Sequence, residues 1–264
     1  MTVYADLLHY RDLFANLFRR DFQAKYKGSL LGIFWSVLNP LVLLGVYLVV
    51  GILFGNGSIP YYPVYLLAGL ASWSFFSVSL MSSSRSMVDS AELIRKVRFP
   101  RQLIALSMVA TQAVTYAVMI AILVVLSLIF VPAARATAWL AIPLAVVLVG
   151  FVAGLSLLVA CLNVLYRDIE HILTAALLPW FFLTPILWHV ASLPASAQRH
   201  HVLLDVLRYG NPVAPAIYAI RDALWSGHLP RLADVIYMVV AAALALALGA
   251  FVFNRVDDRI AVEL

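Results

Sequence analysis

Residues 103–131 read LIALSMVATQAVTYAVMIAILVVLSLIFV, a run of 29 residues without a charged side chain. An α-helix rises 1.5 Å per residue and the hydrocarbon core of a bilayer is about 30 Å thick, so about 20 apolar residues are enough to cross it. We therefore expect a transmembrane helix over this stretch.

The composition of the whole chain agrees with that expectation. Of its 264 residues, 64% are hydrophobic and 12% are charged, and the mean hydropathy is +0.97. So few polar side chains cannot cover a water-soluble globule of this size. The composition therefore excludes a soluble enzyme.

Apolar runs of spanning length recur along the chain. The run after 103–131 is separated from it only by a short turn with Pro132 and Arg135, so the two could form one long hairpin, but each alone is long enough to cross. We predict an all-α integral membrane protein with six transmembrane helices, near residues 31–54, 62–84, 103–131, 138–165, 171–190 and 232–253.

The positive charges between these runs are unevenly distributed. The segments on alternate sides of the membrane carry 13 and 5 Lys and Arg residues. Because Lys and Arg concentrate on the cytoplasmic side, both termini are predicted to be cytoplasmic. The net charge of +5 could suggest nucleic acid, but in so apolar a chain it indicates topology first, and we expect no nucleic-acid partner.

The predicted spans contain almost no ionisable side chains. His171 and His189 lie at the two ends of the fifth span, and Asp234 lies at the start of the sixth. Transporters driven by protons or voltage place such groups deep in the membrane. The sequence also lacks a phosphate-binding glycine loop and a metal-spaced His and Cys cluster. We expect no cofactor or metal in this chain, and any energy for transport must come from another polypeptide.

The polar segment before the first span has the pattern of an amphipathic helix. Over residues 4–27, apolar side chains recur at helical spacing on one side, and Arg19 and Arg20 fall on the other. We assign residues 1–30 to an interface helix on the cytoplasmic side. It either anchors the first span or also contacts a cytoplasmic partner.

A second cytoplasmic element is predicted near residues 86–100, where Ser86 and Asp89 match a capping box and Pro100 ends the segment. A basic loop is expected here from topology alone, but apolar residues in such a loop exceed that need. We therefore expect a short helix that docks on a partner. Its residues are Glu92, Leu93, Ile94, Arg95, Lys96, Val97 and Arg98.

Four motifs resemble one family. LIRKVRFPR (93–101) resembles the segment between spans two and three in the membrane subunits of type-2 ABC exporters of bacterial surface polysaccharides, the O-antigen, capsule and teichoic acid group. The resemblance continues in YKGSLLGIFWSVLNP (26–40), NVLYRDI (163–169) and YGNP (209–212), so it covers most of the chain.

This resemblance implies a homodimeric channel paired with two copies of a separate ATPase, which would bind ATP and Mg. It makes 86–100 the coupling helix and 31–264 the permease domain, in the bacterial cytoplasmic (inner) membrane. The cargo it implies is a polysaccharide on a lipid carrier, undecaprenyl diphosphate. Arg167 and Asp168 are expected to form an ion pair at a helix end, which the ATPase could contact.

A sugar polymer that moves through a channel needs a surface that contacts it without binding it tightly. Aromatic faces suit this because sugar CH groups pack on them. Several aromatic residues lie in the predicted spans, where they either line a path or only pack against neighbours or lipid. The candidates for the path are Trp35, Tyr47, Trp73, Phe75, Phe76, Trp180, Phe181 and Phe182.

The outer loop before the last span is too apolar to be free in water. Residues 203–226 are broken at Gly210 to Pro212, which predicts two short re-entrant helices in the outer leaflet. Candidate residues of an outer gate are Arg208, Asn211, Pro212 and Arg221.

These features predict the channel subunit of an ATP-driven exporter of lipid-linked polysaccharide that is not itself an enzyme. Two alternatives stay open. One is an ABC exporter of a drug or a small lipid. The other is an integral-membrane transferase, for which the sequence shows no buried set of acid, base or metal ligands.

Overall fold

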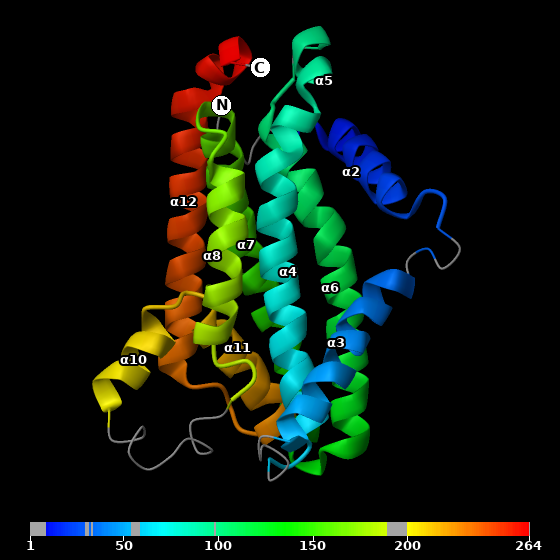
Figure 1. Ribbon diagram of the computed structural model, residues 1–264, viewed down its shortest axis with the longest axis vertical. Helices are drawn as coiled ribbons and strands as arrows, with labels where there is room; N and C mark the ends of the chain where they lie inside the picture. The colour runs from blue at the N-terminus through cyan, green and yellow to red at the C-terminus, as the bar shows by residue number, and fades with distance from the viewer. Residues whose placement is uncertain are drawn as a thin grey trace.

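A computed structural model of the chain describes residues 9–29, 32, 34–53, 59–97, 99–188 and 200–263. Over these residues the regular structure is helical throughout, with no strand (Figure 1). The all-α class predicted from the sequence is therefore confirmed. The part of the interface helix before residue 9, and Arg98 and His189, lie outside the described residues.

Among the described residues, four helices are long and apolar enough to cross a membrane. They are α4 (Tyr62–Asp89), α6 (Gln102–Phe130), α7 (Ala141–Leu165) together with the short turn η3 (Ala138–Leu140) before it, and α12 (Leu232–Glu263) as far as Asp257. The helix expected over 103–131 begins and ends within one residue of its predicted bounds.

The helices α3 and α8 fall at the other two predicted spans but are shorter. The 20 residues of α3 (Phe34–Leu53) contain Pro40, and its apolar part runs from Leu38 to Gly51. The 15 residues of α8 (Ile169–Leu183) rise only about 22 Å. The span predicted at 171–190 is therefore earlier and shorter as a helix, because the chain leaves helical geometry at Thr184, before Pro185.

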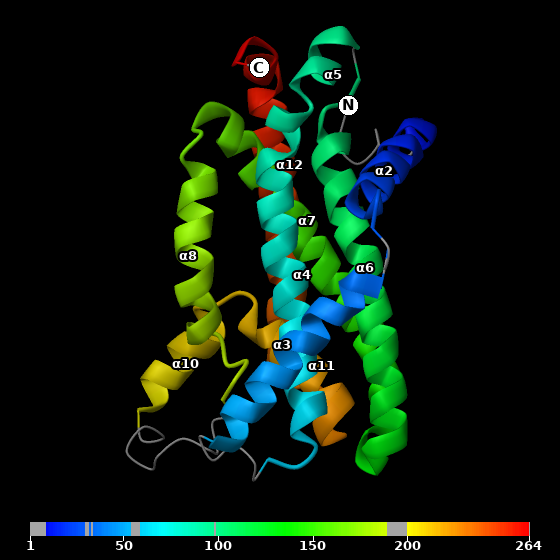
Figure 2. The same cartoon turned by 45° about the vertical axis from the view of Figure 1, so that its right-hand side comes forward.

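The remaining elements lie at the two ends of the long helices (Figures 1 and 2). At one end, α2 (Arg11–Tyr26) packs beside α6, and α5 (Ala91–Lys96) lies near the last turns of α12. The opposite end holds η2 (Pro132–Ala136), α10 (His201–Tyr209), α11 (Ala214–Arg221) and the π-helical turn η5 (Asp222–Ser226). The helices α10, α11 and η5 occupy the stretch predicted to be re-entrant, and their depth in a membrane stays a prediction.

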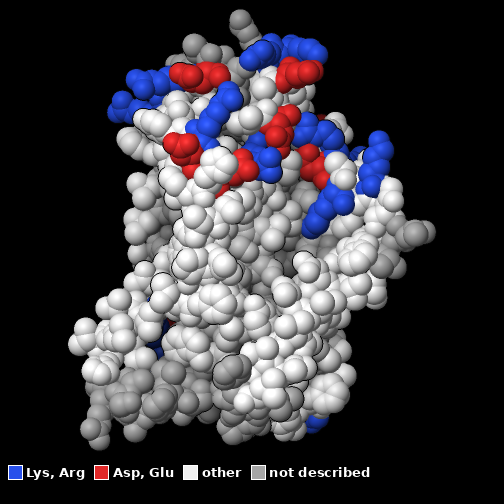
Figure 3. All heavy atoms as spheres, viewed as in Figure 1, with Lys and Arg blue, Asp and Glu red and all other residues white. Residues whose placement is uncertain are grey.

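Charged side chains gather at the α5 end of the face in Figure 3, and most of the body below them carries none. Transferring an unpaired charge into hydrocarbon is costly, so a body of this kind fits a bilayer and the charged end fits the water beside it. This distribution gives the long axis of the molecule a membrane-facing part and a water-facing part.

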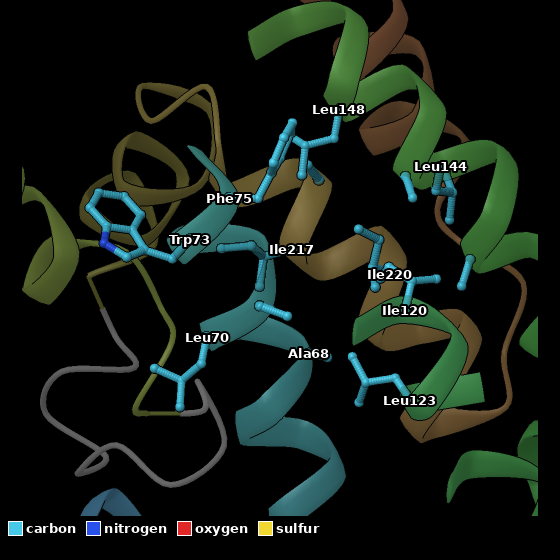
Figure 4. Close-up of a cluster of buried hydrophobic side chains, with 14 of the residues drawn as sticks. Ala68, Leu70, Trp73, Phe75, Ile120, Leu123, Leu144, Leu148, Ile217 and Ile220 are labelled. Atoms are coloured by element: carbon cyan, nitrogen blue, oxygen red, sulfur yellow. The ribbon is translucent and has the colours of Figure 1, made fainter. Parts of the chain in front are cut away.

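The helix α4 is the centre of the packing, and it contacts α3, α6, α7, α8 and α11. Its Leu66 and Phe76 are fully buried. Figure 4 shows part of the cluster that surrounds it, in which side chains from α4, α6, α7 and α11 interdigitate. The labelled members are Ala68, Leu70, Trp73, Phe75, Ile120, Leu123, Leu144, Leu148, Ile217 and Ile220.

The boundary between α4 and α5 differs from the sequence prediction. The expected cap at Ser86 is wrong, because α4 continues to Asp89 and Ser90 is the residue before α5. Ser86 lies inside α4, where its Oγ donates to the carbonyl of Ser83 at 2.7 Å. A serine can lie inside a helix when its hydroxyl donates to a carbonyl of the preceding turn. The sequence therefore has the pattern of a helix cap at Ser86, but the structure does not have the geometry of a cap there.

The pair α7 and α12 makes the most extensive helix contact in the described chain, and glycines allow it. A Cβ at Gly154 would lie 2.5 Å from the carbonyl oxygen of Ala245, and a Cβ at Gly249 would meet the carbonyl oxygen of Gly154. Small residues at such a contact let two helix backbones approach closely, as is typical inside membranes. Gly150 lies one turn away and has more room, with the nearest atom at 3.7 Å.

We predict that Gly154→Ala destabilises the protein by about 1–3 kcal/mol, because the added methyl group collides with backbone that cannot move aside. The matched control Gly150→Ala is expected to leave stability unchanged or raise it by up to about 1 kcal/mol, since alanine favours a helix. Thermal unfolding of the two variants in detergent measures the difference. Equal melting temperatures would contradict the assignment of a close helix contact at Gly154.

Candidate functional site

A cavity of about 510 Å³ lies between α3, α4 and α8. Three predicted path residues line it, namely Tyr47 from α3, Trp73 from α4 and Phe181 from α8. Hydroxyl groups of Ser74, Ser77 and Thr174 are also among its walls. The cavity thus combines aromatic faces with small polar groups, which is a surface suited to sugar rings.

The aromatic rings of this cavity touch one another. The ring of Phe181 lies 5.8 Å from both Tyr47 and Trp73, measured between ring centroids, and the planes are tilted. Trp73 also contacts Trp180 edge to face at 6.2 Å. Aromatic pairs at such distances stabilise each other, so the rings are held in fixed positions by their neighbours.

The other predicted path aromatics lie elsewhere. Phe76 is fully buried against Phe151 and Trp180, so it belongs to the core. Phe75 and Trp35 line a second cavity, on the α6 side of α4. Phe182 is 56% exposed and lines neither cavity.

Arg221, predicted at an outer gate, is 2% exposed and holds the irregular segment that follows α8. Its Nη2 donates to the carbonyl of Ile186 at 2.7 Å, its Nη1 donates to that of Pro185, and its Nε donates to that of Tyr65 at 3.0 Å. Non-helical backbone at membrane depth needs such partners, because no lipid atom can supply a hydrogen bond.

The remaining residues predicted at the outer gate are also bound within the fold. Arg208 of α10 pairs with the fully buried Asp234 of α12, with its Nε donating to Oδ1 at 3.0 Å. Asn211 donates to Thr184 at 2.8 Å and accepts from the indole of Trp180 at 3.0 Å. Its neighbour Pro212 is half-buried in the break between α10 and α11. These contacts tie the two short helices to α8 and α12.

At the charged end, α5 presents only part of its predicted apolar stripe. Val97 is 51% exposed and Leu93 is half-buried, but Ile94 is buried in a cluster that includes Leu17 of α2 and Leu103 of α6. Ile94 therefore fixes α5 to its own chain. The polar predicted residues Glu92, Arg95 and Lys96 are exposed, with Glu92 and Lys96 paired at 3.3 Å.

Two further polar contacts brace this end. Arg101, just before α6, donates from Nη1 to the carboxylate of Asp257 in α12 at 2.9 Å. Asp21 of α2 is buried and accepts a hydrogen bond from the hydroxyl of Ser107 in α6 at 2.6 Å. It also pairs with Arg20 at 2.8 Å, whereas Arg19 is exposed.

The turn between α7 and α8 is organised by Asn163. Its amide donates to the carbonyl of Ser84 in α4 at 2.9 Å, and its oxygen accepts from the backbone of Glu170 at 3.1 Å. The predicted ion pair between Arg167 and Asp168 is not among the described pairs, and both side chains are exposed. Glu170 pairs with Arg85 instead, at 3.4 Å.

Sequence reasoning did not identify Asp21 and Asn163 as residues that join separate helices. Asp21 follows Leu17 by four residues, so it lies on the apolar side of α2, and a charge on an apolar face indicates a buried partner. Asn163 begins the NVLYRDI motif, but no local spacing indicates its two partners, because they lie in α4 and α8. Within the described part of the chain, no group of three or more His, Cys, Asp and Glu side chains is arranged to hold a metal ion.

The chain belongs to the family of ABC-2 type transporters, whose model matches residues 12–225. The family resemblance seen in the sequence motifs is thus confirmed. The match covers all the elements described above except α12.

Three relatives match almost end to end. An O-antigen export system permease protein RfbA from Myxococcus xanthus is 27% identical over 259 residues, which cover 97% of this chain and 96% of the relative. Two proteins of the same name from Klebsiella pneumoniae are 30% and 29% identical over 253 residues, covering 95% of this chain and 94% of each relative.

We predict that Arg221→Met lowers the free energy of unfolding by at least about 2 kcal/mol, because the buried carbonyl groups of Pro185 and Ile186 lose their donor and each costs about 1–3 kcal/mol unpaired. Arg231→Met changes an exposed arginine nearby and is the matched control. The measurement is thermal or denaturant unfolding in detergent. If Arg221→Met unfolded at the same midpoint as the control, Arg221 would not stabilise the segment that follows α8.

Proposed function

We propose that this chain is the membrane subunit of an ATP-driven exporter that carries a lipid-linked polysaccharide of the O-antigen type out of the bacterial cytoplasm. The observation that carries the proposal is the aromatic cavity between α3, α4 and α8, in a chain that aligns almost end to end with three O-antigen export permeases. The family match supports a role as the permease of an ABC transporter, with ATP hydrolysis on a partner subunit.

The chemistry of the cavity supports a sugar cargo. The faces of Tyr47, Trp73 and Phe181 can stack on the CH faces of sugar rings in many orientations. The hydroxyl oxygens of Ser77 and Thr174, which donate to their own helices, can still accept hydrogen bonds from sugar hydroxyls. Contacts of this kind are individually weak. A polymer can therefore move past them without being held at one point.

The proposal includes a finer topology. In it the four long helices cross the membrane, α3 and α8 add two further crossings, and both termini face the cytoplasm. The charged end in Figure 3, which holds α5, is then the cytoplasmic end. Support comes from the distribution of 13 and 5 Lys and Arg residues over alternate segments.

The proposal also includes the assembly. Two copies of this chain form the channel, and two copies of a separate ATPase supply ATP and Mg. The exposed part of 86–100, with Leu93 and Val97, would enter a groove of the ATPase, and Arg19, Arg167 and Asp168 lie exposed at the same end. Their common exposure at one end of the molecule supports a contact surface there.

The topology can be tested with single cysteines. The native Cys161 is buried, so its background labelling is expected to be low. Cysteine in place of His228, which is exposed at the η5 end, should react with an impermeant thiol reagent in intact spheroplasts, and cysteine in place of Arg95 should react only after permeabilisation. Labelling of position 95 in intact spheroplasts would reverse the orientation.

The coupling surface can be tested with Leu93→Asp combined with Val97→Asp. Buried carboxylates in a partner groove cost several kcal/mol, whereas in water they cost little, so export and ATPase copurification should be lost while membrane insertion is kept. The matched control is Tyr166→Asp, which adds a carboxylate at a residue that is 63% exposed at the same end. Normal copurification and export by the double variant would refute the docking role of α5.

The sugar path can be tested with Tyr47→Leu, Trp73→Leu and Phe181→Leu. Each change removes one ring from the cavity and about 0.5–1.5 kcal/mol of stacking, so single variants should be mild and the triple variant should deplete surface polysaccharide. Phe182→Leu, outside the cavity, is the control. The measurement is an immunoblot of surface polymer at matched membrane levels. Complete loss from one substitution would favour a discrete pocket for a small molecule, and an unchanged triple variant would remove these rings from the path.

A further inference from the structure

A second cavity lies beneath α2, on the other side of α4 from the aromatic cavity. Its volume is about 290 Å³, and its walls come from α2, α3, α4 and α6. Figure 2 shows α2 and the first turns of α3 beside α6, below the end that carries α5. The cavity therefore joins Lys25 of α2 to apolar side chains of α4 and α6, such as Phe75 and Met119.

Lys25 brings a positive charge to this cavity. Its Nζ donates to the side-chain oxygen of Gln112 at 2.8 Å and to the hydroxyl of Thr115 at 3.0 Å, both on α6. These partners are neutral, so they orient the ammonium group without cancelling its charge. The described residues that line the cavity include no Asp or Glu.

The contrast with Arg20, on the same helix, is informative. Arg20 has the carboxylate of Asp21 at 2.8 Å, so its charge is balanced within the fold. Lys25 is held over its cavity by two neutral side chains, and no described carboxylate lines that cavity. An anion that entered the cavity would meet an oriented cation at the edge of a low-dielectric region, where their attraction is stronger than in water.

The remaining walls fit the rest of a lipid. Trp35 is 52% exposed at the start of α3, and Phe75, Val78 and Met119 supply apolar surface toward the membrane body. A polar end with one cation beside an apolar wall matches a molecule that joins an anionic head to a hydrocarbon tail.

We propose that this cavity binds the phosphate group of a lipid head, with Lys25 as its cationic partner. The site goes beyond the proposed export function and does not depend on the identity of the sugar. Ordinary anionic phospholipids and a polyprenyl diphosphate carrier share this chemistry. Asn39, Ser74 and Val78 line both this cavity and the aromatic one, so a head group here would lie beside the proposed sugar path.

The test measures binding of soluble short-chain lipids to the complete transporter, this chain with its ATPase partner, in detergent. The ligands are farnesyl diphosphate and dioctanoyl phosphatidylglycerol, and farnesol and dioctanoylglycerol are their phosphate-free controls. Lys25→Gln should weaken binding of at least one phosphate ligand about tenfold and leave both controls unchanged. Lys25→Arg should restore binding, and the loss should shrink as salt is raised.

The matched control is Lys27→Gln, which removes an exposed lysine two residues away that does not line the cavity. A second variant, Val78→Trp, fills the cavity and keeps the charge, so it should weaken binding even if Lys25→Gln folds poorly. Dependence on Lys25 for the diphosphate alone identifies a carrier lipid as the source, dependence for the phosphatidylglycerol alone identifies bulk phospholipid, and dependence for both shows that the site recognises the phosphate they share.

The proposal is overturned if Lys25→Gln and Val78→Trp bind both phosphate ligands as the unaltered transporter does, or if the phosphate-free controls weaken equally. Its failure is distinct from failure of the export function. Surface polysaccharide in cells reports the latter, and binding by the purified complex reports the former.

Discussion

The fold depends on one constraint, which is that backbone groups released from helical geometry inside a membrane must find partners within the protein. The chain leaves the helix at the end of α8, and the guanidinium of Arg221 supplies donors to the carbonyls freed there. The same side chain reaches the carbonyl of Tyr65, so the end of α8 is fixed against α4. The aromatic cavity lies between these two helices and α3, and its shape therefore rests on an arginine that does not line it.

A second consequence concerns where charges are placed. At the end of the molecule that holds α10 and α11, Arg208 of α10 pairs with the buried Asp234 of α12. At the end that holds α5, Asp21 has Ser107 and Arg20 as partners, whereas Lys25 meets only neutral side chains. Lys25 therefore differs from Arg20 on the same helix, whose charge is balanced by the carboxylate of Asp21.

Sequence reasoning succeeded where a pattern is local. Residues 103–131 could be assigned to a helix within one residue, because length and apolar character decide that question without tertiary information. It failed where one local sequence pattern is compatible with two different structures. Ser86 was predicted to cap a helix, but its hydroxyl donates to a carbonyl within α4. Ile94 was predicted to dock on a partner, but its side chain is buried within its own chain. The contacts of Asn163 join α4 to the start of α8, and no spacing in one segment reports such a contact.

The close contact of α7 with α12 at Gly154 and Gly249 has a mechanical consequence. Two helices whose backbones touch cannot slide or tilt independently, so α7 and α12 move as one rigid unit. Arg101, which follows α5, is hydrogen-bonded to Asp257 near the end of α12. If α5 contacts the ATPase as proposed, a displacement of α5 would act on α7 and α12 together. Relative motion would then be left to the less tightly packed α3 and α8, the two helices that border the aromatic cavity with α4.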